Sequence, residues 1–582
     1  MPPPADPTQA TVTAALVRLQ AARGYLPDAA LRELATDLGQ PLSRLEEVVS
    51  FFPHFRRTPP PAVELAVCRD LTCHLRGADR LTAELEAAFA GDDRVEVKQV
   101  SCLGRCDRAV AVCVNRFHGG DHVHDALYLG RSANELIAVG KAAVGGGELP
   151  KPDRDADLMP KLPAWKLDAV ADQSPYAVSL DQWARVRRAE AAGTDPAAAT
   201  DILAKLRVSG LRGMGGAGEP ADRKWLDVAR ARGDVKYIVV NGDESEPGTF
   251  KDRDILLRCP HLVVEGVILA GLACGATRGY VFIRHEYPEQ AAAVRRAIAT
   301  AEQVGACGPH FPVTVYVSPG GYICGEQSAL IEAMEGHRAQ PRNRPPTLAT
   351  NGLFDKPTLV SNVETFAWVP GIVRHGGEWY KGLSPAGTGG RLFSISGDVT
   401  RPGVYEVPIG ATLRDLVDGA GGVVGGENAL LAVATSGPSG GFVPRRVSGG
   451  GPRETAKFTD VLDAQLDIDA FRKLGLALGA GLAVYAFGAD LTAAAVNATA
   501  FYRNESCGKC VPCRVGAQKL LDIGRGLLGR TVPADEQSAV KQVVGELDRA
   551  LGQTSICGLG AVAAKPLVSL LQYFPLTKGG RP

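Results

Sequence analysis

The stretch Tyr237-Ile-Val-Val-Asn-Gly-Asp-Glu-Ser-Glu246 joins four apolar residues, which predict a buried strand, to an acidic loop. Two more strand-like runs follow, and helical patterns separate the three runs: the strands are 279–284 and 313–318, and the helices are 262–272 and 288–303. Alternating strands and helices predict an α/β domain with a parallel sheet. Ligands of such sheets bind at the carboxyl ends of the strands, where the acidic loop lies.

Two glycine-rich loops belong to the same region. Residues 210–218 contain five glycines in nine residues, and a second glycine-rich loop, 318–326, follows the third strand. Backbone N–H groups of such loops can approach a phosphate closely. The first loop matches neither the Walker A nor the Gly-x-Gly-x-x-Gly spacing, and each loop alone also fits a flexible turn or a solvated loop. Three ligand-like loops together predict a nucleotide or flavin site.

A run of cysteines near the C-terminus predicts an electron-transfer centre. Cys507, Cys510 and Cys513 form Cys-Gly-Lys-Cys-Val-Pro-Cys, and Cys557 follows at a distance. Three thiolates at this spacing with one distant thiolate are typical of a [4Fe–4S] cluster. A four-cysteine zinc site is the alternative, but such sites usually have two Cys-x-x-Cys pairs. The spacing therefore favours iron–sulfur.

Four more cysteines lie near the N-terminus, in the pairs Cys68/Cys73 and Cys102/Cys106. Each pair follows an apolar strand-like run, so two pairs could meet across a small α/β layer and hold a [2Fe–2S] cluster. The spacing is not the plant-type pattern. From spacing alone, a zinc site or unrelated buried thiols remain equally open.

The composition excludes several functional classes. The chain of 582 residues has 64 Lys+Arg and 64 Asp+Glu, so its zero net charge indicates neither a nucleic acid nor an anionic membrane as partner. Its longest uncharged apolar run, 474–489, is too short to span a bilayer. The N-terminus does not resemble a secretory signal. We therefore expect a cytoplasmic protein with reduced cysteines.

These patterns predict an α/β multidomain fold with two small cluster domains around a nucleotide domain. The expected order is a helical bundle with the N-terminal cysteine domain (1–144), a linker rich in Gly, Pro and Asp (145–175), an α/β domain (176–385), a β-grasp-like module (386–490) and a helical cluster domain (491–582).

Several motifs together resemble the NADH-binding flavoprotein subunit of complex I and its relatives in soluble NAD-linked formate dehydrogenases and hydrogenases. The motifs are Gly213-Met-Gly-Gly-Ala-Gly218, Lys224-Trp225, the run from Asn241 to Arg253, Gly321-Tyr-Ile-Cys-Gly-Glu326, Asn362-Val-Glu-Thr365 and the cysteines Cys507, Cys510, Cys513 and Cys557. Residues 9–144 resemble the complex I subunit with a thioredoxin-like [2Fe–2S] fold. This second resemblance favours a cluster on Cys68, Cys73, Cys102 and Cys106.

The resemblance implies a Rossmann-like FMN domain and specific cofactor contacts. It assigns FMN to a cavity lined by Gly213, Gly215, Gly216, Lys224, Asn241, Asp243, Tyr322, Gly325, Glu326, Asn362 and Thr365. It also places Glu246 near the nicotinamide of NAD(H), and we expect Glu246 and Glu326 to act in catalysis. Main-chain N–H groups and Lys224 would hold the flavin phosphate.

Four positions depart from the family pattern. Met214 replaces an Arg, Glu219 replaces a Phe, Gln327 replaces the second Glu of a pair, and Thr347 replaces a Phe. Phe residues stack on the NADH adenine side in relatives, so Glu219 and Thr347 put that stacking in doubt.

The resemblance predicts a diaphorase subunit, closest to the fused β subunit of a soluble NAD-dependent formate dehydrogenase. A partner with a molybdenum or tungsten pterin and further iron–sulfur clusters would supply electrons through [4Fe–4S] to FMN, and NAD⁺ would be reduced reversibly by hydride transfer. One alternative is the diaphorase subunit of an NAD-reducing hydrogenase. Another is a non-catalytic electron-carrier subunit.

Overall fold

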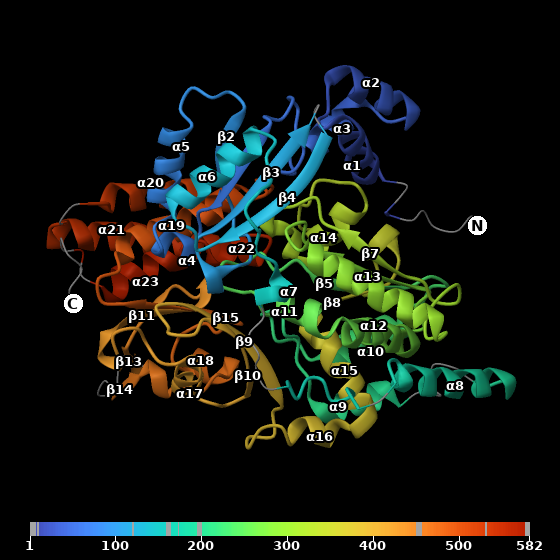
Figure 1. Ribbon diagram of the computed structural model, residues 1–582. Coiled ribbons are helices and arrows are strands. Elements are labelled where there is room, and N and C mark those ends of the chain that lie inside the picture. Colours follow the sequence, from blue (N-terminus) through green and yellow to red (C-terminus); the bar gives the residue numbers. More distant parts are fainter. Residues whose placement is uncertain are drawn as a thin grey trace.

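The structure is a computed structural model that describes residues 7–8, 11–118, 121–158, 164–172, 174–194, 201–449, 457–529, 532–574 and 576. The N-terminal bundle and sheet lie at the top of Figure 1, the central α/β region at the right, a mostly antiparallel sheet at the lower left, and the C-terminal helices at the left. The multidomain α/β fold class is confirmed. The exact domain boundaries stay predictions.

The N-terminal region combines a helical bundle with a four-stranded sheet. Leu16, Leu31 and Leu45 are fully buried and hold the bundle together. The sheet has the order β2-β1-β3-β4, in which β1 runs parallel to β2 and antiparallel to β3. Its elements are α1 (Val12–Arg23), α2 (Asp28–Asp37), α3 (Leu42–Val49), β1 (Val63–Cys68), α4 (Thr72–Leu75), α5 (Ala78–Ala88), β2 (Val95–Val100), η1 (Cys106–Arg108), β3 (Ala111–His118), β4 (Asp121–Leu129) and α6 (Ala133–Val144).

The central domain contains the predicted parallel sheet, with strand order β7-β6-β5-β8. Strands β5 (Tyr237–Gly242), β6 (Arg278–Ile283) and β7 (Val313–Val317) confirm the three predicted strands, whereas β8 (Thr358–Asn362) was missed. The surrounding helices are α8 (Ala177–Ala191), α9 (Ile202–Ser209), α10 (Ala221–Arg230), α11 (Lys251–Arg258), α12 (Pro260–Cys274), α13 (Pro288–Gln303), η2 (Tyr322–Gly325), α14 (Gln327–Met334), η3 (Leu353–Asp355), α15 (Val363–His375) and α16 (Gly377–Lys381).

Helix α12 fills the core of this domain. Every residue from Leu262 to Cys274 is buried, and the helix packs between the sheet and α15. Within the described part of the chain, no single helix is long and apolar enough to cross a membrane. The pair α11 and α12 passes that test only when joined, and the two helices are bent by 91°.

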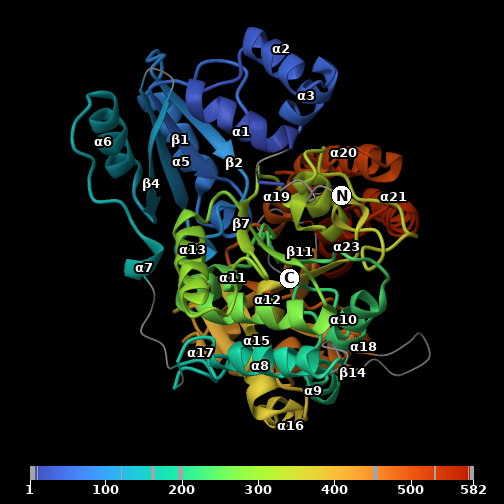
Figure 2. The same cartoon turned by 90° about the vertical axis from the view of Figure 1, so that its right-hand side faces the viewer.

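The third sheet and the C-terminal helices complete the molecule, as the rotated view in Figure 2 also shows. The sheet order is β10-β9-β15-β11-β12, with β9 and β15 parallel. Its region comprises β9 (Gly390–Gly397), β10 (Gly403–Pro408), α17 (Leu413–Gly419), η4 (Glu427–Ala429), β11 (Leu430–Pro438), β12 (Phe442–Pro444), β13 (Arg446–Gly449), β14 (Lys457–Asp460), η5 (Val461–Asp463), α18 (Ile468–Lys473) and β15 (Gly481–Ala486). The helices are α19 (Leu491–Glu505), α20 (Val511–Leu527), α21 (Ala534–Thr554), α22 (Gly558–Val562) and α23 (Lys565–Tyr573).

The segment expected to be a linker packs against three domains over its described residues, 145–158 and 164–172, and we refer to it as the strap. Its short helix α7 (Asp155–Leu158) begins with the buried Asp155, whose carboxylate lies 2.6 Å from the Arg105 guanidinium of the N-terminal domain. Further on, the backbone N–H groups of Lys166 and Leu167 donate to the Glu406 carboxylate of β10. Backbone polar groups that leave water need such acceptors.

The contact between Glu406 and the strap predicts a pH-dependent term in stability. Burial raises the pKa of Glu406 to about 7 from its usual 4.5. An acid with a raised native pKa stabilises the fold fully below about pH 4.5, and this contribution is lost as the pH rises through about 7. Because Glu406→Gln cannot ionise, we expect its thermal midpoint to fall less than that of the wild type between pH 5 and pH 8.

The expected difference is on the order of 1–2 kcal/mol after allowance for solvent screening. Glu378→Gln, which removes an exposed partner of Lys381, is the matched control and should keep the wild-type pH dependence. Identical pH dependence in the Glu406 variant would show that this carboxyl does not titrate differently on folding.

Candidate functional site

The four N-terminal cysteines converge at the edge of their sheet. Cys68 ends β1, Cys73 lies in α4, Cys102 follows β2 and Cys106 begins η1, and all four are at most 2% exposed. The Sγ atoms of Cys102 and Cys106 are 3.6 Å apart. Backbone N–H groups of Gly104 and Gly248 donate to Cys102 Sγ and Cys106 Sγ at 3.4 and 3.3 Å. Four thiols and two N–H···S contacts fit a [2Fe–2S] cluster.

Electrostatics distinguish these thiols. Hydrogen bonds from Cys106 and Cys68 lower the pKa of Cys102, and the nearby Arg284 guanidinium lowers it further. The same contacts and burial raise the pKa of Cys68 and Cys106. A metal binds thiolates, so bound iron would replace these protons.

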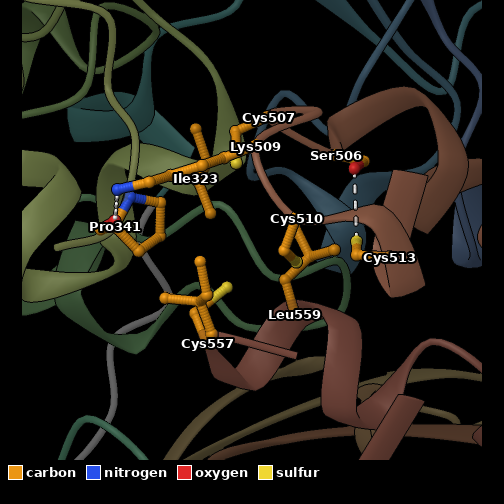
Figure 3. Close-up of a pocket in the computed structure, with 10 residues that line it drawn as sticks. Ile323, Pro341, Ser506, Cys507, Lys509, Cys510, Cys513, Cys557 and Leu559 are labelled. Carbon is orange, nitrogen blue, oxygen red and sulfur yellow. Dashed lines mark hydrogen bonds between the residues drawn. The ribbon is translucent and has the colours of Figure 1, made fainter. Parts of the chain in front are cut away.

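The C-terminal cysteines line one pocket between α19, α20 and α22, shown in Figure 3. Cys507, Cys510, Cys513 and Cys557 all face it, together with the apolar Ile323 and Leu559 and the polar Ser506 and Lys509. The Ser506 hydroxyl lies 3.2 Å from Cys513 Sγ, and the Lys509 ammonium donates to the Pro341 carbonyl at 2.7 Å. Four thiols in one concave pocket fit a [4Fe–4S] cluster.

This second set of cysteines lies closer to the surface than the first. Cys507, Cys510 and Cys557 are partly exposed, whereas Cys513 is buried. Burial raises the pKa of Cys513 and of Cys557 to about 11. Exposed apolar residues stand beside the pocket: Val511, Val515 and Ile556.

Between the two cysteine sets, the carboxyl ends of the parallel strands form a polar cradle. Asn241, at the end of β5, donates to the Gly325 carbonyl at 2.8 Å and accepts from the Asp243 N–H at 3.2 Å. This ties the acidic loop to the glycine loop after β7. Burial raises the pKa of Asp243 to about 7. A Cβ at Gly325 would stand only 3.3 Å from the Asp243 carbonyl, so the close approach favours glycine.

The first glycine loop forms the opposite wall of this cradle. Thr365 of α15 accepts from the Met214 N–H at 2.9 Å, and Gly215 lies against Asn362, where an added Cβ would be 3.3 Å away. Gly216 has a φ of +108° and no atom within 4 Å of an added Cβ, so its backbone borders open space. Exposed backbone of this kind suits a phosphate or ribityl group.

Lys251 supports Asn362 from below and was not predicted. Its buried ammonium lies 2.6 Å from Asp252, 3.0 Å from Glu364 and 3.2 Å from the Asn362 side-chain oxygen. Asn362 in turn donates to Asp252 at 2.7 Å. Lys251 belongs to the motif run that ends at Arg253, but only the tertiary structure reveals its contact with Asn362, 111 residues away.

The two predicted catalytic carboxylates have different surroundings. Glu246 accepts from the Ser439 N–H at 3.1 Å and the Tyr502 hydroxyl at 3.3 Å. Glu326 caps α14, since one oxygen accepts from Ser328 N–H and Ala329 N–H, both at 2.9 Å, while Arg344 pairs with the other. Glu326 therefore has a structural role as the N-cap, and the catalytic roles of both residues stay predictions.

Lys224 and two of the departures from the family pattern meet at the cradle. The Lys224 ammonium donates to the Gln327 amide oxygen at 3.0 Å and lies 3.6 Å from the Glu219 carboxylate. Burial lowers the pKa of Lys224, and the nearby Glu219 opposes that shift. Because its hydrogen-bond partner Gln327 is neutral, Lys224 has charge available for a phosphate.

Comparison with known families agrees with this arrangement of centres. Four family models match successive parts of the chain: a thioredoxin-like [2Fe-2S] ferredoxin over residues 5–127, the Nuo51 FMN-binding domain over 206–371, an SLBB domain over 392–443, and the NADH-ubiquinone oxidoreductase-F iron-sulfur binding region over 493–577. The fold and its centres define an NAD(H)-dependent iron–sulfur flavoprotein subunit of the diaphorase class.

Individual relatives specify the family. The F 2 polypeptide of the NADH-quinone oxidoreductase of Rhizobium meliloti is 38% identical over 64% of this chain and 87% of its own length. The mitochondrial NADH dehydrogenase [ubiquinone] flavoprotein 1 of Dictyostelium discoideum is 38% identical over 64% of this chain and 77% of its own length. The chain belongs to the family of NuoF-like flavoprotein subunits of complex I.

A solved structure matches almost the whole chain. A chain of an NAD⁺-reducing [NiFe]-hydrogenase in the H2-reduced state superposes with a TM-score of 0.80 at 30% identity, covering 99% of this chain and 94% of that chain. The predicted cofactors, FMN, NAD(H), [2Fe–2S] and [4Fe–4S], are confirmed at the level of the families, and the zinc alternatives are not supported.

The first site prediction concerns the C-terminal cysteines. We expect Cys507→Ser to abolish the [4Fe–4S] electron paramagnetic resonance signal and to lower iron by about four atoms per chain, because an alkoxide is a poorer iron ligand than a thiolate. FMN content should persist, since the cradle lies elsewhere. Cys307→Ser, which changes a buried cysteine outside both sets, should keep all its iron. Full iron in Cys507→Ser would exclude this residue as a ligand.

The second site prediction concerns the nucleotide. In Gln327→Glu the new carboxylate faces the Lys224 ammonium across the present 3.0 Å contact and neutralises part of its charge. We expect NAD(H) to bind more weakly by up to about 1 kcal/mol, because the dinucleotide is itself anionic. Gln518→Glu, beside Arg503 on the C-terminal helices, is a matched control. Titration with NADH at constant FMN content measures the effect, and equal or tighter binding in Gln327→Glu would refute it.

Proposed function

We propose that this chain is the diaphorase subunit of a soluble NAD-dependent formate dehydrogenase complex. The observation that carries the proposal is the placement of two cysteine sets on either side of one flavin cradle within a single chain. Bound FMN supplies exchange between hydride transfer and single-electron transfer. The residues of this chain hold the cofactors, orient the nucleotide and exclude water.

The residue roles in this proposal follow from the cradle geometry. The glycine loop and Lys224 bind the flavin phosphate, and Asn241, Asp243, Asn362 and Thr365 fix the rest of the flavin. Glu246 faces the nicotinamide nucleotide. Lys251 acts through Asn362 rather than on the flavin directly.

A partner subunit would dock beside the C-terminal cluster. The cysteines there are partly exposed and stand next to the apolar Val511, Val515 and Ile556. An exposed apolar rim around a cluster suits close approach of a second iron–sulfur protein. We assign to that partner the molybdenum or tungsten pterin and the formate site. Reduced thiolates and NAD(H) suit the cytoplasm, where we place the complex.

A second candidate is the diaphorase subunit of an NAD-reducing hydrogenase. The coverage of 94% of a hydrogenase chain favours it. The Asn-Gly-Asp-Glu-Ser-Glu-Pro run at 241–247 favours the formate dehydrogenase relatives. A non-catalytic carrier is less well supported, because the residues of the cradle are retained.

Two measurements test the proposal. The purified chain should show a flavin spectrum and reduce a dye with NADH, and absence of both would exclude a diaphorase. The complex purified from its native source should contain molybdenum or tungsten and reduce NAD⁺ with formate. Nickel and H₂-dependent NAD⁺ reduction would instead establish the hydrogenase alternative.

A further inference from the structure

Helix α19 contacts all three candidate redox centres. Near its middle, the Asn497 side chain donates to the Arg69 carbonyl at 2.9 Å and accepts from the Leu71 N–H at 3.0 Å, within the loop that joins Cys68 to Cys73. At its end, Glu505 accepts from the Tyr322 N–H of the cradle at 2.9 Å. The C-terminal cysteine run starts two residues later, at Cys507.

The same helix end reaches the Glu246 carboxylate. Tyr502 is fully buried, and its hydroxyl donates to Glu246 Oε1 at 3.3 Å. The Ser439 N–H of the β11–β12 turn donates to the same oxygen at 3.1 Å, and the Tyr322 hydroxyl is a further hydrogen-bond partner. The carboxylate is thus held by donors from three domains.

The approach of the β11–β12 turn to this site is unusually close. A Cβ at Gly437 would stand 2.2 Å from the Pro247 carbonyl, so only glycine allows the turn to lie against the acidic loop. The Ser439 hydroxyl donates to the Ser436 carbonyl at 2.7 Å, which fixes the turn. The contact with Glu246 is therefore built into the domain interface.

We propose that Tyr502 is a positioning residue for nucleotide binding: it holds the Glu246 carboxylate in the orientation that faces NAD(H), and so couples the C-terminal cluster domain to the nucleotide site. The proposal rests on the role of Glu246 under the proposed function. Tyr502 itself touches neither nucleotide nor flavin in this scheme. It acts only through Glu246.

The physical basis is the cost of a poorly solvated carboxylate. Burial raises the pKa of Glu246, and hydrogen bonds from Tyr322, Ser439 and Tyr502 oppose that shift. These three residues are the titratable and polar groups that face Glu246 from the elements packed against it. Loss of the Tyr502 donor leaves a freer carboxylate that is harder to ionise.

A double-mutant cycle tests this with the purified full-length protein. We expect Tyr502→Phe to raise the Kd for NADH about three- to tenfold, as fits loss of one hydrogen bond to a charged group. The acid limb of the pH profile of binding should move to higher pH. In a Glu246→Gln background the same Tyr502 change should alter Kd less than about twofold, because a residue that acts through Glu246 has no effect once that carboxylate is gone.

Controls separate positioning from general damage. Tyr485→Phe removes another buried hydroxyl, one without a hydrogen-bond partner among the described residues, and should leave the Kd unchanged. FMN and iron per chain, measured on every variant, report the fold. If Tyr502→Phe loses its cofactors, Ser439→Ala, which removes only the hydroxyl of the turn, should still raise the Kd in the same direction.

The outcomes are distinct. If Glu246→Gln leaves the Kd unchanged, the proposed role of Glu246 itself is wrong. If Glu246→Gln weakens binding but Tyr502→Phe does not, only the positioning role fails. Equal effects of Tyr502→Phe in both backgrounds would also overturn it, since they would show that Tyr502 acts independently of Glu246.

Discussion

The buried Glu244 carboxylate fixes the loop on which the other sites depend. It accepts from the N–H groups of Asp252 and Arg253 at 2.8 and 3.0 Å and from the Tyr287 hydroxyl at 3.2 Å. Burial and the nearby Asp252 raise its pKa, so these donors compensate for lost solvation. Arg284 donates to the Glu244 carbonyl and to the Cys102 carbonyl, and this places the flavin loop and the N-terminal cysteine loop in one hydrogen-bonded unit.

The local patterns of the sequence predicted the parallel strands and both cysteine sets, because strand periodicity and ligand spacing are short-range properties. Strand β8 was missed because it has five residues, ends in Ser361-Asn362 and leads directly into α15. Lys251 and Tyr502 were missed for another reason: their partners lie 111 and 256 residues away. Neither contact has a signal within its own segment. The strap has the composition of a linker, and its packing depends on tertiary contacts alone.

The two cysteine sets differ in ways that suit different tasks. The N-terminal set is fully enclosed, and Arg253 and Arg284 grip the carbonyls of its loop. Such enclosure fixes geometry and keeps water away from the cluster. The C-terminal set lies at the surface with three partly exposed cysteines. Electron exchange with another protein requires the accessible position, while storage close to the cradle is compatible with the enclosed one.

The strap has a consequence for assembly. The complex I relatives align with 64% of this chain, whereas here the thioredoxin-like domain is carried on the same polypeptide and tied down through Asp155 and Glu406. Tethered partners experience an effective concentration on the order of millimolar for short connections. The enclosed cluster and the flavin domain are therefore produced in a fixed one-to-one ratio, and dilution cannot separate them.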